Sequence, residues 1–211
     1  MLTILLGQVG CMSSKKLTDW KVDEWRMVKT DKNDPPSWII YSRKLDANFL
    51  EYKIEGEIDA SPQSCIDVFR QDIYDQAQKS KNKKYPVYKI VSESKDTLLT
   101  YVVHNEPFPL KDTEMSVKYF FQEGNERQTR VSWKEAWELS NVQPTKKLSR
   151  VETFRGSWGF SSHLDNPTCK ATNTVQFDPK KVPMWLVQPM VIKFLKSGLK
   201  DIEEKVSDGK I

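Results

Sequence analysis

Three charged residues in the second half of the chain could place a polar group inside a folded domain: Lys118, Glu135 and Arg155. Lys118 and Glu135 fall on neighbouring predicted strands and are therefore able to form a buried ion pair, whereas a lone buried charge would be costly. Strand alternation allows another arrangement, in which the apolar residues beside Lys118 face inward and Lys118 faces solvent. Arg155, flanked at two-residue spacing by hydroxyl side chains, is an alternative polar lining.

Large aromatic residues accompany these charges. Trp133 and Trp137 lie four positions apart, which places both on one face of a continuous strand. That face is typical of a cavity wall, although packing of a ligand-free core explains the pair equally well. The other residues that we expect to line an interior space are Tyr101, Asn173, Met190 and Phe194.

Catalytic signatures are missing from the sequence. The two histidines, His104 and His163, are expected at the surface, and no Cys–His pair is suggested by the spacing. The sequence contains no Gly-x-Ser-x-Gly motif, no cluster of metal ligands and no phosphate-binding glycine loop. We therefore expect no metal, no cofactor and a binding role in preference to an enzymatic one.

The three cysteines are too few and too scattered for a disulfide framework or a zinc site. Cys65 and Cys169 are expected to be small buried hydrophobic residues. Cys11 follows an apolar run that ends in Val9-Gly10, which resembles the end of a bacterial lipoprotein signal. Lipidation of Cys11 would place the protein in the cell envelope or periplasm, and the alternative is an ordinary N-terminus on a cytoplasmic protein.

Length and composition favour one soluble domain. The chain has 211 residues, of which 38% are hydrophobic and 29% charged, with a net charge of +4. Basic and acidic residues are interleaved, so no nucleic-acid footprint is indicated, although transient contact with an anionic membrane surface is compatible with the charge. We expect a monomer with an N-terminal extension over residues 1–34 and a domain over residues 35–211.

The element most clearly predicted is a long amphipathic helix over residues 181–206. Its apolar residues recur every three or four positions: Met184, Val187, Val191, Leu195, Leu199, Ile202 and Val206. Pro183 suits the first helical turn. Pro189 removes one backbone hydrogen bond and is expected to kink the helix or to split off its first turn.

Upstream of this helix the pattern is mostly strand. Alternating residues predict two strands, then a helix that Ser61 caps and that ends near Gln78, and then about six strands. The predicted strands cover residues 38–45, 49–58, 85–92, 97–105, 114–122, 127–139, 148–161 and 168–177. Without strand–helix–strand alternation the sheet should be antiparallel, which predicts an α+β fold with the sheet curved around the last helix. The mixed polarity of inward positions indicates a cavity.

Several segments resemble a known family. Residues 151–160 (VETFRGSWGF), 172–179 and 182–187 look like the C-terminal half of START domains, the steroidogenic acute regulatory protein-related lipid transfer domains. Residues 60–74 resemble the second helix of the family, and residues 107–118 resemble its proline-containing loop. The match covers about residues 38–206. It implies the helix-grip fold, a bent antiparallel sheet around a C-terminal helix, with one lipid or other hydrophobic molecule in the tunnel between them.

The resemblance also implies roles for individual residues. Lys118 stands where many members carry an arginine that meets the polar end of the ligand. The loop over residues 106–112 is expected to guard the tunnel mouth, with Phe108 and Leu110 as a gate that faces Met190 and Phe194 of the last helix. A satellite hydrophobic cluster under a long loop is the alternative for these apolar residues.

The function expected from the resemblance is the binding of a single lipid or sterol-like molecule, with transfer or sensing as its purpose. The alternative is a helix-grip enzyme of the cyclase or hydrolase type that acts on a hydrophobic aromatic substrate. In that case Lys118, Glu135 or Arg155 would supply the acid–base groups.

Overall fold

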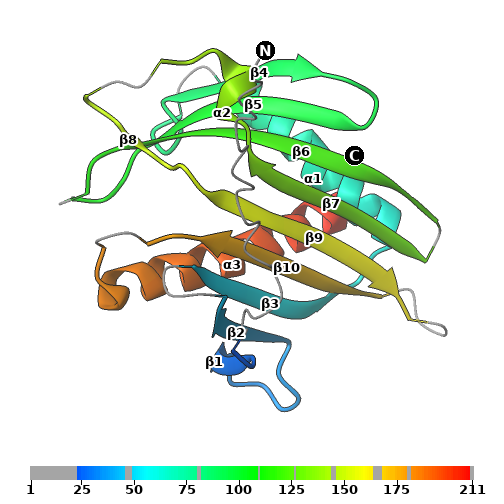
Figure 1. Cartoon of the computed structure of the whole chain (residues 1–211). Helices are drawn as coiled ribbons and strands as arrows, with labels where there is room; N and C mark the ends of the chain where they lie inside the picture. Colours follow the sequence, from blue (N-terminus) through cyan, green and yellow to red (C-terminus); the bar gives the residue numbers. More distant parts are fainter. Residues whose placement is uncertain are drawn as a thin grey trace, which may run out of the picture.

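The structure is a computed structural model that describes residues 23–45, 49–79, 82–108, 110–125, 127–143, 146–163, 168–179 and 182–209. Cys11 and the signal expected over residues 1–11 lie outside these residues. The described chain forms one large sheet with the helices α1 (Pro62–Gln78) and α3 (Met184–Ser207) on the same face (Figure 1). Over this part of the chain, none of the helices combines the length and hydrophobicity needed to cross a bilayer.

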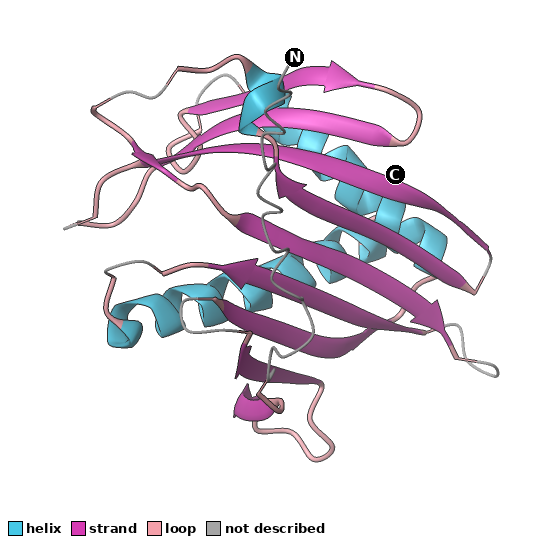
Figure 2. Ribbon diagram, viewed as in Figure 1, coloured by secondary structure: helices cyan, strands magenta, loops and turns pink. Residues whose placement is uncertain are grey.

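The sheet has ten described strands, and all the pairings along its main path are antiparallel (Figure 2). Its order is β1-β2-β3-β10-β9-β7-β6-β5-β4, with the short β8 paired in parallel to β6. The strands are β1 (Arg26–Thr30), β2 (Trp38–Lys44), β3 (Leu50–Ile58), β4 (Val87–Glu93), β5 (Thr97–His104), β6 (Thr113–Asn125), β7 (Gln128–Glu135), β8 (Ser149–Arg150), β9 (Phe154–Ser162) and β10 (Cys169–Phe177). The predicted helix-grip architecture, an open curved sheet with a long C-terminal helix, is confirmed.

Two strand predictions were wrong. Residues 127–139 do not form one strand, because β7 ends at Glu135 and the short helix α2 (Trp137–Ser140) follows. Residues 148–161 divide into β8 and β9. Within the extension predicted over residues 1–34, β1 pairs with β2 of the sheet.

The first helix begins where the sequence predicts. The Ser61 side chain accepts a hydrogen bond from the Ser64 backbone N–H at 3.1 Å, and Pro62 occupies the first helical position. The helix ends at Gln78. Its N-terminal end is attached to the sheet by Thr129 of β7, whose hydroxyl donates to the Pro62 carbonyl at 2.9 Å.

The last helix is continuous through Pro189, so the predicted splitting of its first turn does not occur. It spans 24 residues, and Val187, Leu195, Leu199 and Ile202 are buried. These are four of the residues in the predicted apolar stripe. The stripe packs on the sheet near β3 and β10, while α1 packs near β7, so the two helices together cover a wide area of one face.

We call the sheet face covered by α1 and α3 the inner face. Alternation along β6 places four residues on it, all of which belong to the hydrophobic core: Met115, Val117, Tyr119 and Phe121. On β7, Val131 and Trp133 face the same way, and on β9 Trp158 and Phe160 do so. The core therefore lies between one side of the sheet and the two helices.

Both edge strands are irregular. The β1–β2 register shifts between Met27 and Lys29, and the β4–β5 register shifts between Ile90 and Ser92. Each shift is a bulge, which bends the strand and interrupts its row of backbone hydrogen-bonding groups.

Close contact between α3 and β3 depends on Gly56. A methyl group built on Gly56 would lie 2.6 Å from Leu199 Cδ2 and 3.2 Å from the Ser37 carbonyl oxygen. We expect Gly56→Ala to lower the free energy of unfolding by about 1–3 kcal/mol, because the added methyl group would displace the buried Leu199 side chain of α3 from its position against β3. Urea unfolding of wild type and variant would measure the difference.

Gly159→Ala is the matched control. No atom lies within 4 Å of a methyl group built on Gly159, so its effect should stay within about 0.5 kcal/mol. Equal losses for the two variants would show that glycine flexibility, and not helix contact, accounts for the result at Gly56.

Candidate functional site

A continuous row of aromatic rings crosses the inner face from α1 to α3. We call it the aromatic row, and its members are Phe69, Tyr119, Trp133, Phe154 and Phe194. Ring centroids lie 6.3 Å apart between Phe69 and Trp133, 6.2 Å between Trp133 and Phe154, and 6.4 Å between Phe154 and Phe194. Tyr119 joins the row 6.0 Å from Phe69. The row is part of the packed core, and its ring faces are surfaces on which flat or chain-like apolar groups can pack.

Trp133 lies at the centre of this row, and Gly156 leaves space for its indole ring. A methyl group built on Gly156 of β9 would lie 2.4 Å from Trp133 Cζ2, so the indole covers the backbone of the neighbouring strand. Trp133 is 5% exposed. The sequence predicted the inward direction of Trp133 but not its dependence on Gly156.

Two buried polar atoms near the helices have no hydrogen-bond partner among the described atoms: Trp133 Nε1 and Asn173 Oδ1. Asn173 is 2% exposed and lies on the inner face of β10 with Ala171 and Val175. A buried donor or acceptor left without a partner costs about 1–3 kcal/mol. Such atoms are uncommon in folded proteins, and they are the part of this interior most able to recognise a polar group.

Asn173 lies under α3. A methyl group built on Gly198 of α3 would be 3.9 Å from Asn173 Nδ2 and 3.5 Å from Trp158 Cζ2. These are ordinary contact distances, so α3 crosses directly over the asparagine at Gly198. Asn173 and Trp133 were both expected to line the interior, and the structure places both on the inner face.

Tyr119 adds a neutral hydroxyl to the same face. Burial raises the pKa of Tyr119 to about 12, although hydrogen bonding with Tyr88 acts in the other direction. Burial also raises the pKa of Tyr88. Both phenols therefore stay protonated near neutral pH. They can donate and accept hydrogen bonds, but they cannot act as bases.

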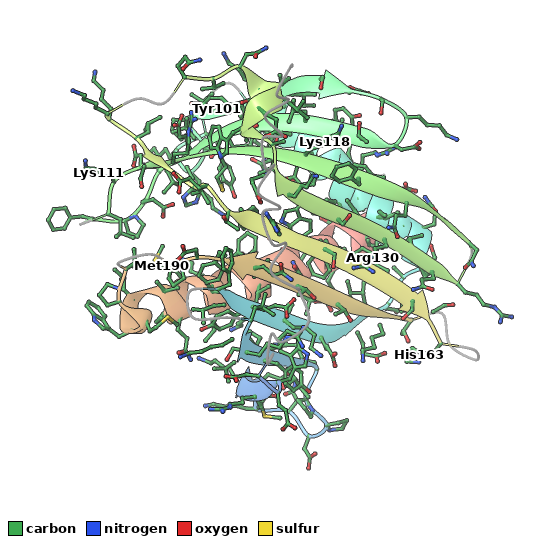
Figure 3. The ribbon with its side chains drawn as sticks, in the orientation of Figure 1. Tyr101, Lys111, Lys118, Arg130, His163 and Met190 are labelled. Atoms are coloured by element: carbon green, nitrogen blue, oxygen red, sulfur yellow. The ribbon has the colours of Figure 1, made fainter. Side chains whose placement is uncertain are left out.

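The expected Lys118–Glu135 pair does not form. In the β6–β7 register Lys118 lies opposite Lys134, and both ammonium groups lie over the Phe120 ring, at 5.4 and 5.8 Å from its centroid (Figure 3). Because the alternate residues of β6 fill the core, Lys118 is on the outer face. Lys118 thus lies across the sheet from the interior.

Tyr101 and Trp137 also belong to the outer face. The Tyr101 hydroxyl donates to Glu114 Oε2 at 3.0 Å, and Arg150 Nε donates to Glu114 Oε1 at 3.0 Å. The Arg150 guanidinium lies 3.7 Å from the centre of the Trp137 ring, and Trp137 Nε1 donates to the Val151 carbonyl. Trp137 does not share a strand face with Trp133, because the strand has ended before it. These contacts hold the segment from α2 to β8 over β5 and β6.

Glu135 pairs with Arg155. Arg155 Nη2 donates to Glu135 Oε1 at 2.5 Å, and the Phe154 backbone N–H donates to Glu135 Oε2 at 3.3 Å. Burial alone would raise the pKa of Glu135, but the hydrogen bonds from Arg155 and the Phe154 amide hold it below its usual value. The Glu135 carboxylate therefore links β7 to β9 at the end of their paired region. Since the Arg155 side chain is 55% exposed, the pair lies at the sheet end and not deep in the interior.

The residues expected to form a gate are not packed together. Phe108 is 97% exposed, which leaves no area for contact with Met190 or Phe194. Leu110 is half-buried, and its N–H donates to the Pro107 carbonyl at 3.0 Å in a turn. Phe194 is 42% exposed and contacts Phe154 instead. Lys111 and Met190 lie toward the same end of the molecule (Figure 3).

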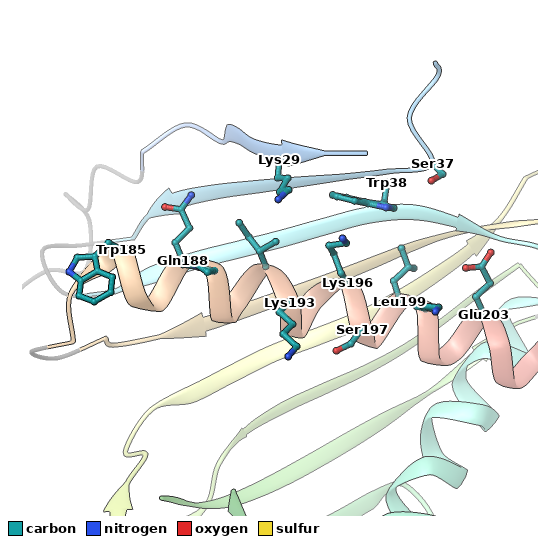
Figure 4. A pocket seen from close by; sticks show the side chains of 13 residues that line it. Lys29, Ser37, Trp38, Trp185, Gln188, Lys193, Lys196, Ser197, Leu199 and Glu203 are labelled. Atoms are coloured by element: carbon teal, nitrogen blue, oxygen red, sulfur yellow. The ribbon is translucent and has the colours of Figure 1, made fainter. Parts of the chain in front are cut away.

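A surface groove lies beside α3, on the side of the helix that faces β1 and β2 (Figure 4). Its volume is about 760 Å³, and its lining includes Trp38, Ile192 and Leu199 together with Lys29 and Lys196. The Lys196 ammonium lies 4.8 Å from the centre of the Trp38 ring. Sequence reasoning missed this groove, because it depends on the position of β1, for which no strand was predicted.

Comparison with solved structures identifies the fold. A STAR-related lipid transfer protein from Xanthomonas axonopodis superposes with a TM-score of 0.69 and 15% identity, over 88% of this chain and 99% of that chain. The chain has the START fold. Human STARD10 superposes with a TM-score of 0.67 and 17% identity, over 88% and 75% of the two chains.

More distant structures share the architecture. Human StAR-related lipid transfer protein 5 superposes with a TM-score of 0.63 and 9% identity, over 89% of this chain and 88% of that chain. The Zhui aromatase/cyclase from Streptomyces is less similar, with a TM-score of 0.51 and 10% identity over 75% of this chain and 96% of that chain. No protein-family model and no curated protein sequence matches the chain.

The Glu135–Arg155 pair leads to a pH prediction. The pKa of Glu135 is lower in the folded state than its unfolded value of about 4.3, so the carboxylate stabilises the fold above that value. This stabilisation is lost as the pH falls through the folded pKa. We expect Glu135→Gln to lower the free energy of unfolding by about 1 kcal/mol at pH 7, and the difference from wild type to shrink toward pH 3.

Urea unfolding at pH 7, 5 and 3 measures this difference. Glu24→Gln, at an exposed position, is the control and should behave like wild type at each pH. A difference between wild type and Glu135→Gln that stays constant with pH would contradict the role assigned to the carboxylate.

Proposed function

We propose that this protein binds one lipid or other hydrophobic molecule between the inner face of the sheet, α1 and α3, and transfers or senses it. The fold is one that lipid transfer proteins use. The aromatic row supports the proposal, because a ligand lying against it would remove apolar surface from water on both partners at about 25 cal/mol per Å². The fold alone does not specify a ligand, so the ligand class must be inferred from the chemistry of the inner face.

The observation that carries the proposal is the pair of buried, unpartnered polar atoms. Trp133 Nε1 is a donor only, and Asn173 Oδ1 is an acceptor. A hydroxyl group on an otherwise apolar ligand can accept from an indole N–H and donate to an amide oxygen, and so satisfies either atom. Because both atoms are neutral, an uncharged polar end is the better match than an anionic headgroup. A sterol-like alcohol or a neutral lipid fits this description.

Uptake requires an opening at one end of the interior. We assign this to the loop over residues 106–112, with Phe108 and Leu110 as the moving apolar residues, and to Met190 and Phe194 at the facing part of α3. The exposure of Phe108 suits insertion into a membrane surface during transient contact. Trp185, 76% exposed in the first turn of α3, is a second apolar side chain available for that contact.

Native mass spectrometry of gently purified protein, with extraction of any co-purified lipid, tests binding directly. We expect Asn173→Leu to weaken the binding of a fluorescent hydroxyl-bearing sterol about tenfold, the effect of one lost hydrogen bond of about 1.4 kcal/mol. Thr174→Val, on the opposite face of the same strand, is the matched control and should bind like wild type. Recovery of no lipid, together with no binding of fluorescent lipids by wild type, would overturn the proposal.

The gate is tested by kinetics. Phe108→Ala should slow ligand transfer between vesicles about tenfold, because burial of a phenylalanine in the membrane is worth about 1.5–3 kcal/mol. Equilibrium binding from solution should be unchanged. Leu139→Ala, which truncates another exposed apolar residue, is the control. Unchanged transfer by Phe108→Ala would place the opening elsewhere.

The second candidate function is a helix-grip enzyme, which the likeness to an aromatase/cyclase favours. The acid–base groups expected for it are poorly placed, because Lys118 is on the outer face and Glu135 is paired with Arg155 at the sheet end. On the inner face the ionisable groups described above are phenols with raised pKa values. Turnover of an aromatic polyketide-like substrate that Tyr119→Phe abolishes, with folding intact, would favour this candidate.

A further inference from the structure

Two cysteines that are far apart in the sequence meet in the core. Cys65, in the first turns of α1, and Cys169, the first residue of β10, have their Sγ atoms 3.6 Å apart, although 104 positions separate them. Both residues are 0% exposed and both are free thiols. The sequence predicted that each is buried, and this is confirmed. It did not predict that they are neighbours.

The elements that carry the two thiols are held in place independently of them. The N-terminal end of α1 is capped by Ser61 and bonded to β7 through Thr129 and the Pro62 carbonyl. Cys169 is paired on both sides within the sheet, to Ile58 of β3 and to Ser162 of β9. The short distance between the sulfur atoms is therefore set by the fold.

We propose that Cys65 and Cys169 form an intramolecular disulfide when the protein meets an oxidising thiol–disulfide environment, with a low-molecular-weight disulfide such as glutathione disulfide as the oxidant. The sulfur atoms must approach by about 1.5 Å to reach the disulfide bond length of about 2.05 Å. Adjustment of side-chain torsions is the smallest change that could supply this approach. The bond would join α1 directly to β10.

The chemistry proceeds by two exchanges. The thiolate of one cysteine attacks a sulfur of glutathione disulfide, which forms a mixed disulfide and releases one glutathione thiolate. The thiolate of the second cysteine then attacks the protein sulfur of the mixed disulfide and releases the second glutathione. The protein loses two protons and two electrons, and glutathione disulfide is reduced to two molecules of glutathione.

Burial controls the rate of this reaction. The contact with Cys169 and burial both raise the pKa of the Cys65 thiol, whereas the hydrogen bond from Cys65 lowers the pKa of Cys169, so Cys65 resists ionisation and Cys169 is the thiol that would supply the thiolate. The oxidant also has no direct access to residues that are 0% exposed. Oxidation should therefore be slow in the folded state and fast when the start of α1 opens or before folding is complete. In a reducing compartment the pair should remain as two thiols.

The proposal is tested with full-length protein that carries Cys11→Ala, so that only the two core cysteines remain. The protein is incubated with glutathione disulfide near its urea midpoint, returned to buffer and compared with an untreated sample. Non-reducing peptide mapping should recover Cys65 and Cys169 as one linked peptide pair. The Tm should rise by about 5–15 °C, because the bond closes a loop of more than a hundred residues, and dithiothreitol should reverse the rise.

Cys65→Ala and Cys169→Ala, each in the Cys11→Ala background, are the controls, and glutathione disulfide should leave their Tm unchanged. If these variants fail to fold, the peptide map of the Cys11→Ala protein decides by itself. Recovery of glutathione adducts or intermolecular dimers without the linked pair would overturn the proposal. So would a linked pair whose formation lowers the Tm. None of these readouts involves a lipid, so the result is independent of the proposed function.

Discussion

The packing of α3 across the inner face of the sheet is the contact on which the rest of the structure depends. A helix of 24 residues with a continuous apolar stripe needs a long complementary surface. The curved sheet supplies it, and Gly56 lets the helix and β3 approach where a side chain would intervene. The helix is consequently fixed over Asn173 and beside the aromatic row. The buried surroundings of Asn173 follow from that placement.

The inner face around the aromatic row is uncharged. The ion pairs described above, Glu114–Arg150 and Glu135–Arg155, lie on the outer face or at a strand end, and the inner face presents aromatic rings with an amide, an indole N–H and phenols. Desolvating a charge is far more costly than desolvating a neutral dipole. Under the function proposed above, such an interior would select a ligand by shape and by one hydrogen-bonding group. The two unpartnered atoms would then be a cost to the stability of the protein without its ligand.

Much of the fold could be predicted from periodicity, because the stripe of α3 and the alternation of the strands are strong local signals. The site residues show where this reasoning stops. Alternation predicts that Lys118 and its neighbours in the sequence point to opposite faces of the sheet. Only the tertiary structure shows that the neighbours face inward. The period of two that grouped Trp137 with Trp133 fails because Ala136 leaves the strand conformation. The meeting of Cys65 with Cys169 and the groove beside β1 both arise from contacts between distant segments, for which no local pattern exists.

The bulges in β1 and β4 have a consequence for the behaviour of the molecule in concentrated solution. A sheet that is not closed into a barrel exposes two rims of unpaired amide and carbonyl groups, and regular rims invite strand-to-strand association. Here each terminal strand of the described sheet is interrupted within its own short length, at Met27–Lys29 and at Ile90–Ser92. A second molecule would find only a few consecutive groups in register. The irregular edge strands therefore disfavour association of molecules through the edges of their sheets.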